Sequence, residues 1–376
     1  MKIINYGKQY LDKDDYKHVK KVLETDTITR GKFVNKFEDK ISKYVGSKYS
    51  ITCNSGSSAI LMSFLALDLK SNDNIIMPSI NFIASYNSAI FLGANIFLAD
   101  VDCMTGQMSP KNVEDCIKKN KIKKVKIIVT QYHGGYPENV SKFYKLKKKL
   151  KCKLIEDACH AFGASYFINK KKYKVGSCSH SDLCTFSFHP LKTITTGEGG
   201  AVTTNSKNLK KVLIQLRSNG ITKEKKYNWI SKSKVSGFNF NLTDFQCALG
   251  ISQLSKIKMF LNKRKKIFDF YVKNLRNLKK FEVPEYKNKI LPSYHLFFLH
   301  LKFATLVKKK KFFSYMKKNK INIMYHYIPI YNFKSFRGKS HGKNAEKYFL
   351  SSISLPIHYS LTKYQLSFIV SKIKKF

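Results

Sequence analysis

The sequence predicts an α/β protein in which a large domain with a mainly parallel sheet is joined to a smaller C-terminal α+β domain. Short apolar runs alternate with longer segments of helical periodicity through the first two-thirds of the chain. After a long helical stretch the order of elements changes, and 376 residues suffice for two domains. We expect the large domain to cover residues 1–250, and a linking helix with the small domain to cover residues 251–376.

The predicted strands of the large domain are short and apolar, which is typical of parallel strands buried on both faces. They cover residues 50–53, 74–77, 95–99, 126–131 and 153–157. Helical periodicity marks the segments between them, at residues 57–69, 82–92, 110–118 and 139–150. This alternation favours a sheet with helices on both faces. Ligands of such sheets gather where the carboxyl ends of strands meet helix N-termini.

The C-terminal third has a different order of elements. A helical stretch with no proline, and with Gly250 as its one glycine, runs from about residue 242 to residue 275 and could link the two domains. It is followed by a predicted strand at 295–301, a helix at 305–318, a strand at 322–327 and a closing helix near 362–374.

The charge of the chain is strongly positive, because 70 lysines and arginines stand against 24 aspartates and glutamates, a net charge of +46. A surface for nucleic acid or anionic membrane is one interpretation. The excess is nearly all lysine, 65 residues against five arginines, and it is spread along a chain rich in Ile, Asn, Phe and Tyr. We therefore attribute it to A/T-rich codons and predict no nucleic-acid and no membrane partner. A basic surface still attracts phosphorylated substrates.

The sequence predicts a cytoplasmic protein without a metal site. MKIINYGKQYLDKDD has no apolar stretch behind a basic head, and the uncharged segment 75–99 is broken by Pro78 and Gly93. The eight cysteines form no C-x-x-C pair and have no zinc-finger spacing with histidine. We expect most of them to be reduced and buried.

Three segments carry candidate site residues. The first, CNSGSSAI at 53–60, ends a predicted strand and opens a helix. Gly56 lets the backbone approach a ligand, and the N–H groups of Ser57 and Ser58 lie at the positive end of the helix dipole, which suits a phosphate. An ordinary helix cap is the alternative interpretation.

In the second segment, KLIEDACHAFGA at 153–164, a buried strand ends in Glu156 and Asp157. A carboxylate at a buried strand end is costly unless it meets a cation or a hydrogen-bond donor. A protonated pyridine nitrogen is one such partner. A helix cap or an ion pair within the protein is the alternative.

The third segment, FSFHPLKTITTGEGGAV at 186–202, places Lys192 between an apolar strand and a glycine-rich loop. A lysine attacks a carbonyl only as the free amine, so burial or a neighbouring positive charge must lower its pKa. Gly197, Gly199 and Gly200 are expected to leave room for a planar ring against the backbone. A solvated surface lysine is the alternative.

Together, a phosphate seat, an acid for a ring nitrogen and a lysine that forms a Schiff base describe a site for pyridoxal 5'-phosphate (PLP). With these motifs the chain resembles the DegT-type nucleotide-sugar aminotransferases, which are fold type I PLP enzymes. The resemblance runs from TITRGKFVNKFEDKISKYVGSKYSITCNSGSSAI through EDACHAFGASY and GFNFNLTDFQCALGISQL to YHYIPIY and SLPIHYSLT. The form FHPLKTITTGEGG is similar to the members that serve pseudaminic acid synthesis.

The resemblance implies a role for individual residues. Lys192 would be the catalytic lysine and Asp157 would bind the pyridine N–H. The other residues expected at the cofactor are Gly56, Ser57 and Ser187 at the phosphate, Phe82 and His160 at the ring, and Asn239, which would reach the phosphate from the partner subunit of a homodimer. A core aromatic is the alternative for Phe82.

The resemblance also places residues near the sugar nucleotide. These are Tyr6, Arg30, His326, Tyr331 and His358. A structural role for the two histidines and a helix-linking turn at Arg30 are the alternatives. The chain departs from the family in having Asn241 where an arginine usually follows Asn239, which puts the binding of an acidic group there in doubt. Its phosphate seat also reads N-S-G-S-S rather than N-G-T.

The activity that the resemblance implies is a ping-pong transamination. L-glutamate would give its amine to PLP, and the amine would then pass to C4 of a UDP-linked 4-keto-6-deoxy-N-acetylhexosamine for pseudaminic acid or another surface glycan. A sugar aminotransferase with a bacillosamine- or perosamine-type product is the alternative. The related sugar dehydratases carry histidine at the lysine position and are disfavoured by Lys192. The remaining alternative is a regulatory or nucleic-acid-binding protein on the same scaffold, and only the net charge of the chain suggests it.

Overall fold

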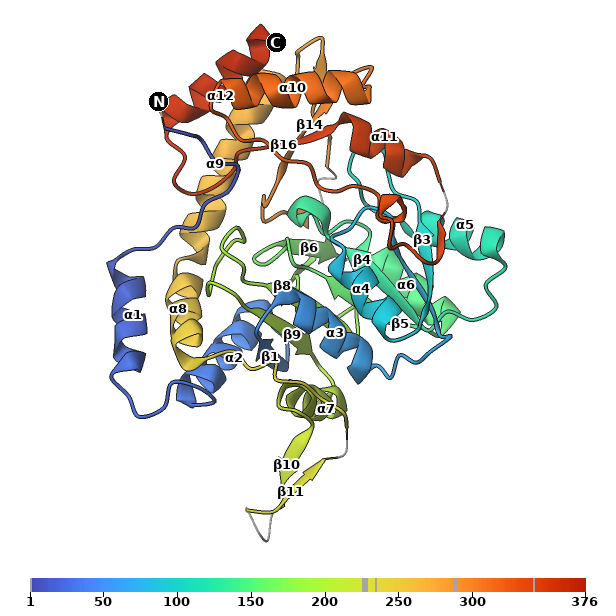
Figure 1. The fold of residues 1–376 in the computed structure, drawn as a ribbon, viewed down its shortest axis with the longest axis vertical. Coiled ribbons are helices and arrows are strands. Elements are labelled where there is room, and N and C mark those ends of the chain that lie inside the picture. Colours follow the sequence, from blue (N-terminus) through green and yellow to red (C-terminus); the bar gives the residue numbers. More distant parts are fainter. Residues whose placement is uncertain (1, 225–228, 234, 287–289, 341) are drawn as a thin grey trace.

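The computed structural model describes residues 2–224, 229–233, 235–286, 290–340 and 342–376. Its centre is a sheet of β1 (Tyr49–Cys53), β2 (Asn74–Pro78), β3 (Asn95–Ala99), β4 (Ile127–Gln131), β5 (Lys153–Asp157), β8 (Leu183–Ser187), β9 (Gly200–Thr204) and β15 (Lys339–Ser340). The spatial order is β1–β9–β8–β5–β4–β2–β3–β15 (Figure 1). β9 pairs antiparallel with β8 and β1, and the pairs from β8 across to β15 are parallel. The predicted α/β class is confirmed.

Helices cover both faces of this sheet because successive side chains of a strand point to opposite faces. Ile75 and Met77 of β2 pack in one apolar cluster with α3 (Gly56–Ala66), α4 (Ala84–Phe91) and α7 (Lys207–Arg217). Ile76, between them, packs in another cluster with α5 (Pro110–Asn120) and α6 (Val140–Leu150). Burial on both faces explains why these strands are apolar without alternation.

The edge of the sheet near β1 is covered by α2 (Lys32–Val45) and α8 (Asp244–Ser255), with α1 (Lys13–Leu23) packed against α8 (Figure 1). Gly250 is required at the crossing of α2 and α8, since a Cβ atom there would lie 2.4 Å from the ring of Phe37. Smaller sheets consist of β6 (Ser165–Ile168), β7 (Lys171–Lys174) and β13 (Ile290–Leu291), and of the projecting pair β10 (Ile221–Lys223) and β11 (Ser231–Ser233).

The C-terminal region builds its own apolar core around a third small sheet. Its elements are α9 (Ile257–Leu275), β12 (Phe281–Glu282), β14 (Phe297–Leu301), α10 (Leu306–Lys318), α11 (Asn344–Ser351), β16 (Ser352–Leu355) and α12 (Lys363–Lys375), with short 3₁₀ turns at His133–Gly135 and Ile330–Asn332 elsewhere. Ile4 packs in the same core, so the N-terminal segment crosses to this region (Figure 1). The predicted division at residue 250 stays a prediction.

Two element predictions for the C-terminal third are wrong. Residues 322–327 do not form a strand. Met324 makes a single bridge to Ser354 at the outer edge of β16, and the pairing goes no further because residues 324–328 form part of the cavity wall. The helical stretch at 242–275 is two helices that meet at Lys256, whose ammonium bonds to Asp12 (2.7 Å) and Asp15 (2.6 Å) next to α1.

The cysteines are reduced and mostly buried, as the sequence predicts. All eight cysteines are free thiols, and six of them are buried, with Cys103 and Cys159 partly exposed. No helix in the described ranges combines the length and apolarity needed to cross a bilayer.

Asp244 provides a long-range cap for α2, and we predict that it stabilises the fold. Its buried carboxylate accepts hydrogen bonds from the N–H groups of Gly31 (2.7 Å) and Phe33 (2.9 Å), while Gly31 has no side chain to cap the helix. Asp244→Ala should lower the free energy of unfolding by about 2 kcal/mol, because it leaves these two N–H groups without a hydrogen-bond acceptor. Urea denaturation at one fixed protein concentration measures this change.

Asp269→Ala is the control for this variant. Asp269 pairs with Lys265 on the exposed surface of α9 at 2.6 Å, so its removal should change stability by less than about 0.5 kcal/mol. Equal losses from the two variants would contradict the capping role of Asp244.

Candidate active site

A cavity of about 580 Å³ opens at the carboxyl ends of the parallel strands. Gln131, Asp157 and Ser187, the last residues of β4, β5 and β8, line one wall. The start of α3 lines another wall, and residues 324–328 of the C-terminal region close a third. The sheet topology thus brings together segments that are far apart in sequence, as expected for α/β proteins.

Most of the predicted site residues meet in this cavity. Those that line it are Tyr6, Gly56, Ser57, Phe82, Asp157, His160, Ser187, Lys192 and His326. Those that do not are Arg30, Asn239, Tyr331 and His358. The structure therefore gathers three separate motifs, while the roles of the individual residues stay predictions.

The start of α3 has free donors that face the cavity. Ser55 caps the helix by accepting a hydrogen bond from the N–H of Ser58 (3.0 Å). Within the described residues the N–H groups of Gly56 and Ser57 have no acceptor. A side chain at position 56 would place its Cβ 2.8 Å from that of Ser187, so glycine is needed for the close approach of α3 to β8. Free N–H groups at a helix N-terminus form an anion seat.

The carboxylate of Asp157 is buried with few partners. The residue is 3% exposed, and its carboxylate accepts hydrogen bonds from the Ser85 hydroxyl (3.4 Å), from the Cys159 N–H (3.2 Å) and from the Cys159 thiol. No ion pair with a lysine or arginine satisfies it in these residues. A buried carboxylate with only long hydrogen bonds favours an additional cationic donor in the cavity.

Lys192 lies in the turn after β8, where its side chain is enclosed and half-buried. Burial is the main cause that lowers the pKa of this ammonium, and the positive charge of Arg264 acts in the same direction. Cys159 and the carboxylate of Asp157 oppose the shift. The result favours a larger fraction of free amine than an exposed lysine has, which is the form that reacts with a carbonyl.

His160 is held in one tautomer by its neighbours. The N–H of Gly134 donates to Nδ1 (3.4 Å), so the neutral ring carries its proton on Nε2, 3.0 Å from the hydroxyl of Tyr327. Burial first, and then the charge of Lys192, lower the pKa of His160 well below its ordinary value. Because Nε2 donates to the Tyr327 oxygen, the phenolic hydrogen of Tyr327 is free to point to another acceptor.

Aromatic rings border the mouth of the cavity. Phe82 is 54% exposed, follows the buried Asn81, and lies 5.9 Å from the ring of Tyr327 between centroids. Tyr6 lies 5.6 Å from the ring of His326, whose Nδ1 is bonded to the Ser354 hydroxyl at 2.8 Å. An exposed Phe82 is not a core residue, so the alternative interpretation of a buried aromatic is wrong.

The predicted residues outside the cavity lie at its periphery or in the core. Arg30 is exposed in a left-handed turn, Tyr331 is half-buried, and His358 is buried with its Nε2 near the Asn5 carbonyl (3.2 Å). Asn239 is exposed on the outside of the chain, and its side-chain oxygen accepts a hydrogen bond from Asn241 (2.8 Å). Asn241 therefore orients Asn239.

The expectation that three glycines leave room for a ring is wrong. Gly197, Gly199 and Gly200 do not line the cavity. A Cβ at Gly200 would lie 2.4 Å from the Ser55 carbonyl, so this glycine permits close packing of β9 on the segment before α3. Glu198, between the glycines, does line the cavity.

The sequence analysis did not identify several residues that line the cavity. Cys159 and Tyr327 stand inside quoted motifs and could have been included, since both neighbour predicted site residues. His295 gave no signal, because a single histidine before an apolar strand is usually structural. Its ring packs against that of His160 in a tilted arrangement, with ring centroids 4.4 Å apart.

The cavity fits PLP on these observations. The free N–H groups of α3 with Ser187 suit the phosphate, and Asp157 has capacity for a pyridine N–H. Lys192 presents an amine on the same cavity. Together with the α/β architecture, this arrangement defines a fold type I enzyme that uses PLP.

Comparisons with known proteins agree. Residues 9–374 match the model of the DegT/DnrJ/EryC1/StrS aminotransferase family. The UDP-4-amino-4,6-dideoxy-N-acetyl-beta-L-altrosamine transaminase of Campylobacter jejuni subsp. jejuni serotype O:23/36 (strain 81-176) is 33% identical, with 99% of each chain covered. GDP-perosamine synthase of Escherichia coli O157:H7 is also 33% identical, over 74% of this chain and 73% of its own.

A solved structure is similar over the whole chain. Helicobacter pylori PseC, an aminotransferase involved in the biosynthesis of pseudoaminic acid, superposes with a TM-score of 0.90 at 30% identity, covering 100% of this chain and 99% of its own. The chain belongs to the DegT/DnrJ/EryC1/StrS aminotransferase family. The predicted family, enzyme class and cofactor are thereby confirmed.

Glu156, next to Asp157, should make stability depend on pH. Burial raises the pKa of its carboxyl from 4.5 to about 7. Between these values the folded state binds more protons than the unfolded state, so stability falls as pH rises. Glu156→Gln should remove this loss and stabilise the protein relative to the wild type by about 2 kcal/mol at pH 8, with little difference at pH 4. Urea unfolding at both pH values measures it.

Glu282→Gln is a suitable control, because Glu282 is exposed on β12. A wild type and a Glu156→Gln variant with parallel pH profiles would show that Glu156 ionises normally.

Proposed function

We propose that this protein transfers an amino group from L-glutamate to C4 of a UDP-linked 4-keto-6-deoxy-N-acetylhexosamine, in the synthesis of pseudaminic acid or a related surface glycan. The observation that carries the proposal is the meeting of Lys192, Asp157 and the free N-terminus of α3 in one cavity. Relatives that cover nearly the whole chain are named for this type of reaction, which supports the substrate class.

The residues of this chain would divide the work as follows. The first-turn N–H groups of α3 and Ser187 bind the phosphate of PLP, and Asp157 accepts the pyridine N–H. When bound, PLP withdraws electrons from the carbon that carries the amino group and stores the amine between the two half-reactions. Lys192 holds the cofactor before the reaction and, as a free amine, moves the proton at the substrate carbon.

The sugar nucleotide would enter through the aromatic mouth of the cavity. Tyr6, Phe82 and His326 line this entrance, and the cavity of about 580 Å³ is within the usual range of ligand pockets. Arg30, Tyr331 and His358 are proposed to act at the periphery, where the structure places them outside the cavity wall. Desolvation lowers the pKa of His358 to about 4, so this buried ring would support the pocket in its neutral form.

A GDP-linked 4-keto sugar is the second candidate substrate. GDP-perosamine synthases of two organisms are 32–33% identical, although over less of this chain than the altrosamine transaminases. Amine transfer to both UDP- and GDP-linked 4-keto sugars, compared under equal conditions, separates the candidates. A preference for the GDP sugar would overturn the proposed substrate but not the aminotransferase class.

We further propose a cytoplasmic homodimer whose active sites are shared. In one chain Asn239 faces outward and is oriented by Asn241, which suits a residue that serves the cavity of a neighbouring subunit. The cytoplasmic location is proposed because nucleotide-activated sugars are substrates of the cytoplasm. The positive net charge of the chain would attract such a substrate.

The first test of the proposal is optical. PLP-loaded wild type should show a visible absorbance band that L-glutamate shifts to the near ultraviolet, because the amine is transferred to the cofactor. Lys192→Ala should lose the lysine-dependent band and at least about 10³-fold of the transferase rate. Asp157→Asn should keep the band but lose about 10²-fold, since electron withdrawal by the ring weakens.

Lys211→Ala on the exposed face of α7 is the matched lysine control and should behave as wild type. Absence of any band after PLP is supplied to the wild type would overturn the cofactor site, and a band that L-glutamate leaves unchanged would overturn the amino donor.

Shared sites predict complementation between two inactive variants. Lys192→Ala and Asn239→Ala homodimers should each be impaired, because every site contains one defect. Mixed dimers combine both defects in one site and leave the other site intact. Refolding the two variants together should therefore restore about one quarter of the wild-type activity. Activity that stays at the mean of the two separate variants would show that Asn239 does not serve the partner's site.

A further inference from the structure

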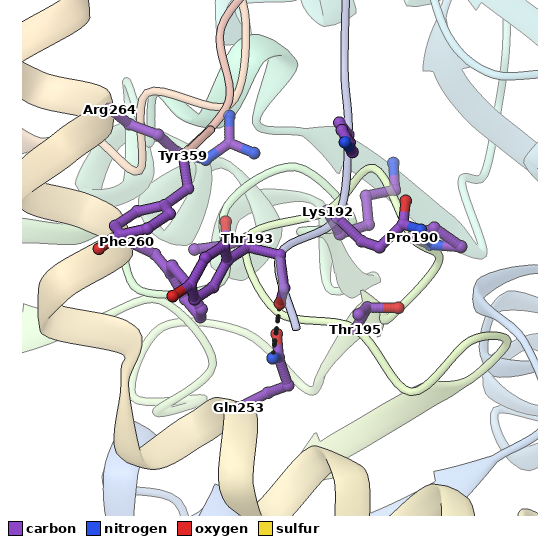
Figure 2. A pocket seen from close by; sticks show the side chains of 11 residues that line it. Pro190, Lys192, Thr193, Thr195, Gln253, Phe260, Arg264 and Tyr359 are labelled. Atoms are coloured by element: carbon purple, nitrogen blue, oxygen red, sulfur yellow. Dashed lines mark hydrogen bonds between the residues drawn. The ribbon is translucent and has the colours of Figure 1, made fainter. Parts of the chain in front are cut away.

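A second, smaller cavity lies beside Lys192 and is closed by α9. Arg264 projects from α9 toward the segment that carries Lys192 (Figure 2). The other walls come from residues 8–10, which include the basic side chain of Lys8, and from Pro190, Thr193, Thr195, Gln253, Phe260 and Tyr359. Gln253 is fixed by its hydrogen bonds to the Tyr10 carbonyl (3.0 Å), the dashed line in Figure 2, and to Asp15 of α1 (2.9 Å), so this wall is held against α1.

Arg264 is a buried cation that has no carboxylate partner among the described residues. Its side chain is 5% exposed, and its Nη1 donates to the carbonyls of Ile357 (2.9 Å), His295 (3.2 Å) and Tyr294 (3.4 Å). No ion pair to Arg264 exists within the described ranges. Burial lowers the pKa of this guanidinium only to about 10, so the charge persists at neutral pH. Neutral carbonyls solvate this charge but do not cancel it.

The charge acts on a lysine that has opposing neighbours. The other ionisable groups coupled to Lys192 are Asp157, Cys159, His160, His189, His295 and His326. Burial keeps the four histidines neutral by lowering their pKa values. Asp157 therefore favours the ammonium form of Lys192, and Arg264 is the charged neighbour that favours the amine.

We propose that Arg264 is a positioning residue: a buried positive charge that shares a cavity with Lys192, partly counteracts Asp157 and so increases the fraction of Lys192 present as the free amine, while its bonds to the His295 and Ile357 carbonyls fix α9 against the cavity wall. The inference rests on the proposed function, in which Lys192 must attack a carbonyl, because only a free amine can do so. A purely structural Arg264 would hold the same carbonyls but leave the ionisation of Lys192 unchanged.

Competitive acetylation of the cofactor-free protein tests this proposal without relying on activity. Trace acetic anhydride reacts with neutral amines, so the extent of acetylation of the Lys192 peptide against pH, read by mass spectrometry, gives the ionisation midpoint. We expect a wild-type midpoint below that of the exposed Lys211. Arg264→Gln, which keeps one donor for the carbonyls, should raise the midpoint by about one pH unit, as loss of a nearby unit charge predicts.

Three further variants separate charge from packing. Arg264→Lys keeps the charge and should leave the midpoint near that of the wild type, even if stability falls. Arg264→Met is a second neutral variant and should match Arg264→Gln. Phe260→Leu disturbs the same cavity wall without a change of charge and should not move the midpoint. Circular dichroism and thermal midpoints identify any variant that fails to fold.

The outcomes decide between the alternatives. An unchanged midpoint in folded Arg264→Gln and Arg264→Met, or an equal rise in Phe260→Leu, would overturn the inference. An ionisation midpoint of Lys192 that depends on Arg264 would support the inference even if PLP gave no visible band. The missing band would count against the proposed function alone.

Discussion

The site depends on keeping a lysine neutral in the presence of a carboxylate. Asp157 and Lys192 line the same cavity, and an ion pair between them would hold Lys192 as the ammonium, which cannot attack a carbonyl. The structure opposes this outcome chiefly by enclosing Lys192, and we infer that the charge of Arg264, on the wall of the second cavity, acts in the same direction. The strands, α3 and α9 form the frame that holds Lys192, Asp157 and Arg264 in place.

That frame follows from the sheet. Because β4, β5 and β8 are parallel, their last residues meet at one edge, and Asp157 and Ser187 arrive there together although 30 positions separate them. Glycine at position 56 lets α3 lie against β8, so the free N–H groups of the helix reach the same edge. The C-terminal region then closes the cavity with residues 324–328, which is why that segment bends and cannot continue as a strand.

Much of this could be predicted from local pattern. The strands at 95–99 and 153–157 have the predicted bounds, and nine of the thirteen predicted site residues line the cavity, because strand ends and helix starts leave clear marks in sequence. The strand at 322–327 could not be excluded, since the cavity wall that this segment forms is assembled only in three dimensions. Arg264 could not be found, because it stands in the run KRKK, which indicates a solvated helix face. Asn239 is exposed and does not line the cavity of its own chain, so a single chain does not test its proposed role in a dimer.

The distribution of charge has a kinetic consequence. The chain carries a net charge of +46, yet Lys192 is the one lysine or arginine among the described residues that line the large cavity, and the histidines there are neutral. Long-range attraction and short-range retention of an anion are therefore separated in space: the surface speeds capture, while the interior offers little fixed charge to slow release. Added salt should weaken the encounter step and leave dissociation of the aminated product almost untouched, so that a highly basic enzyme need not become trapped by its own anionic product.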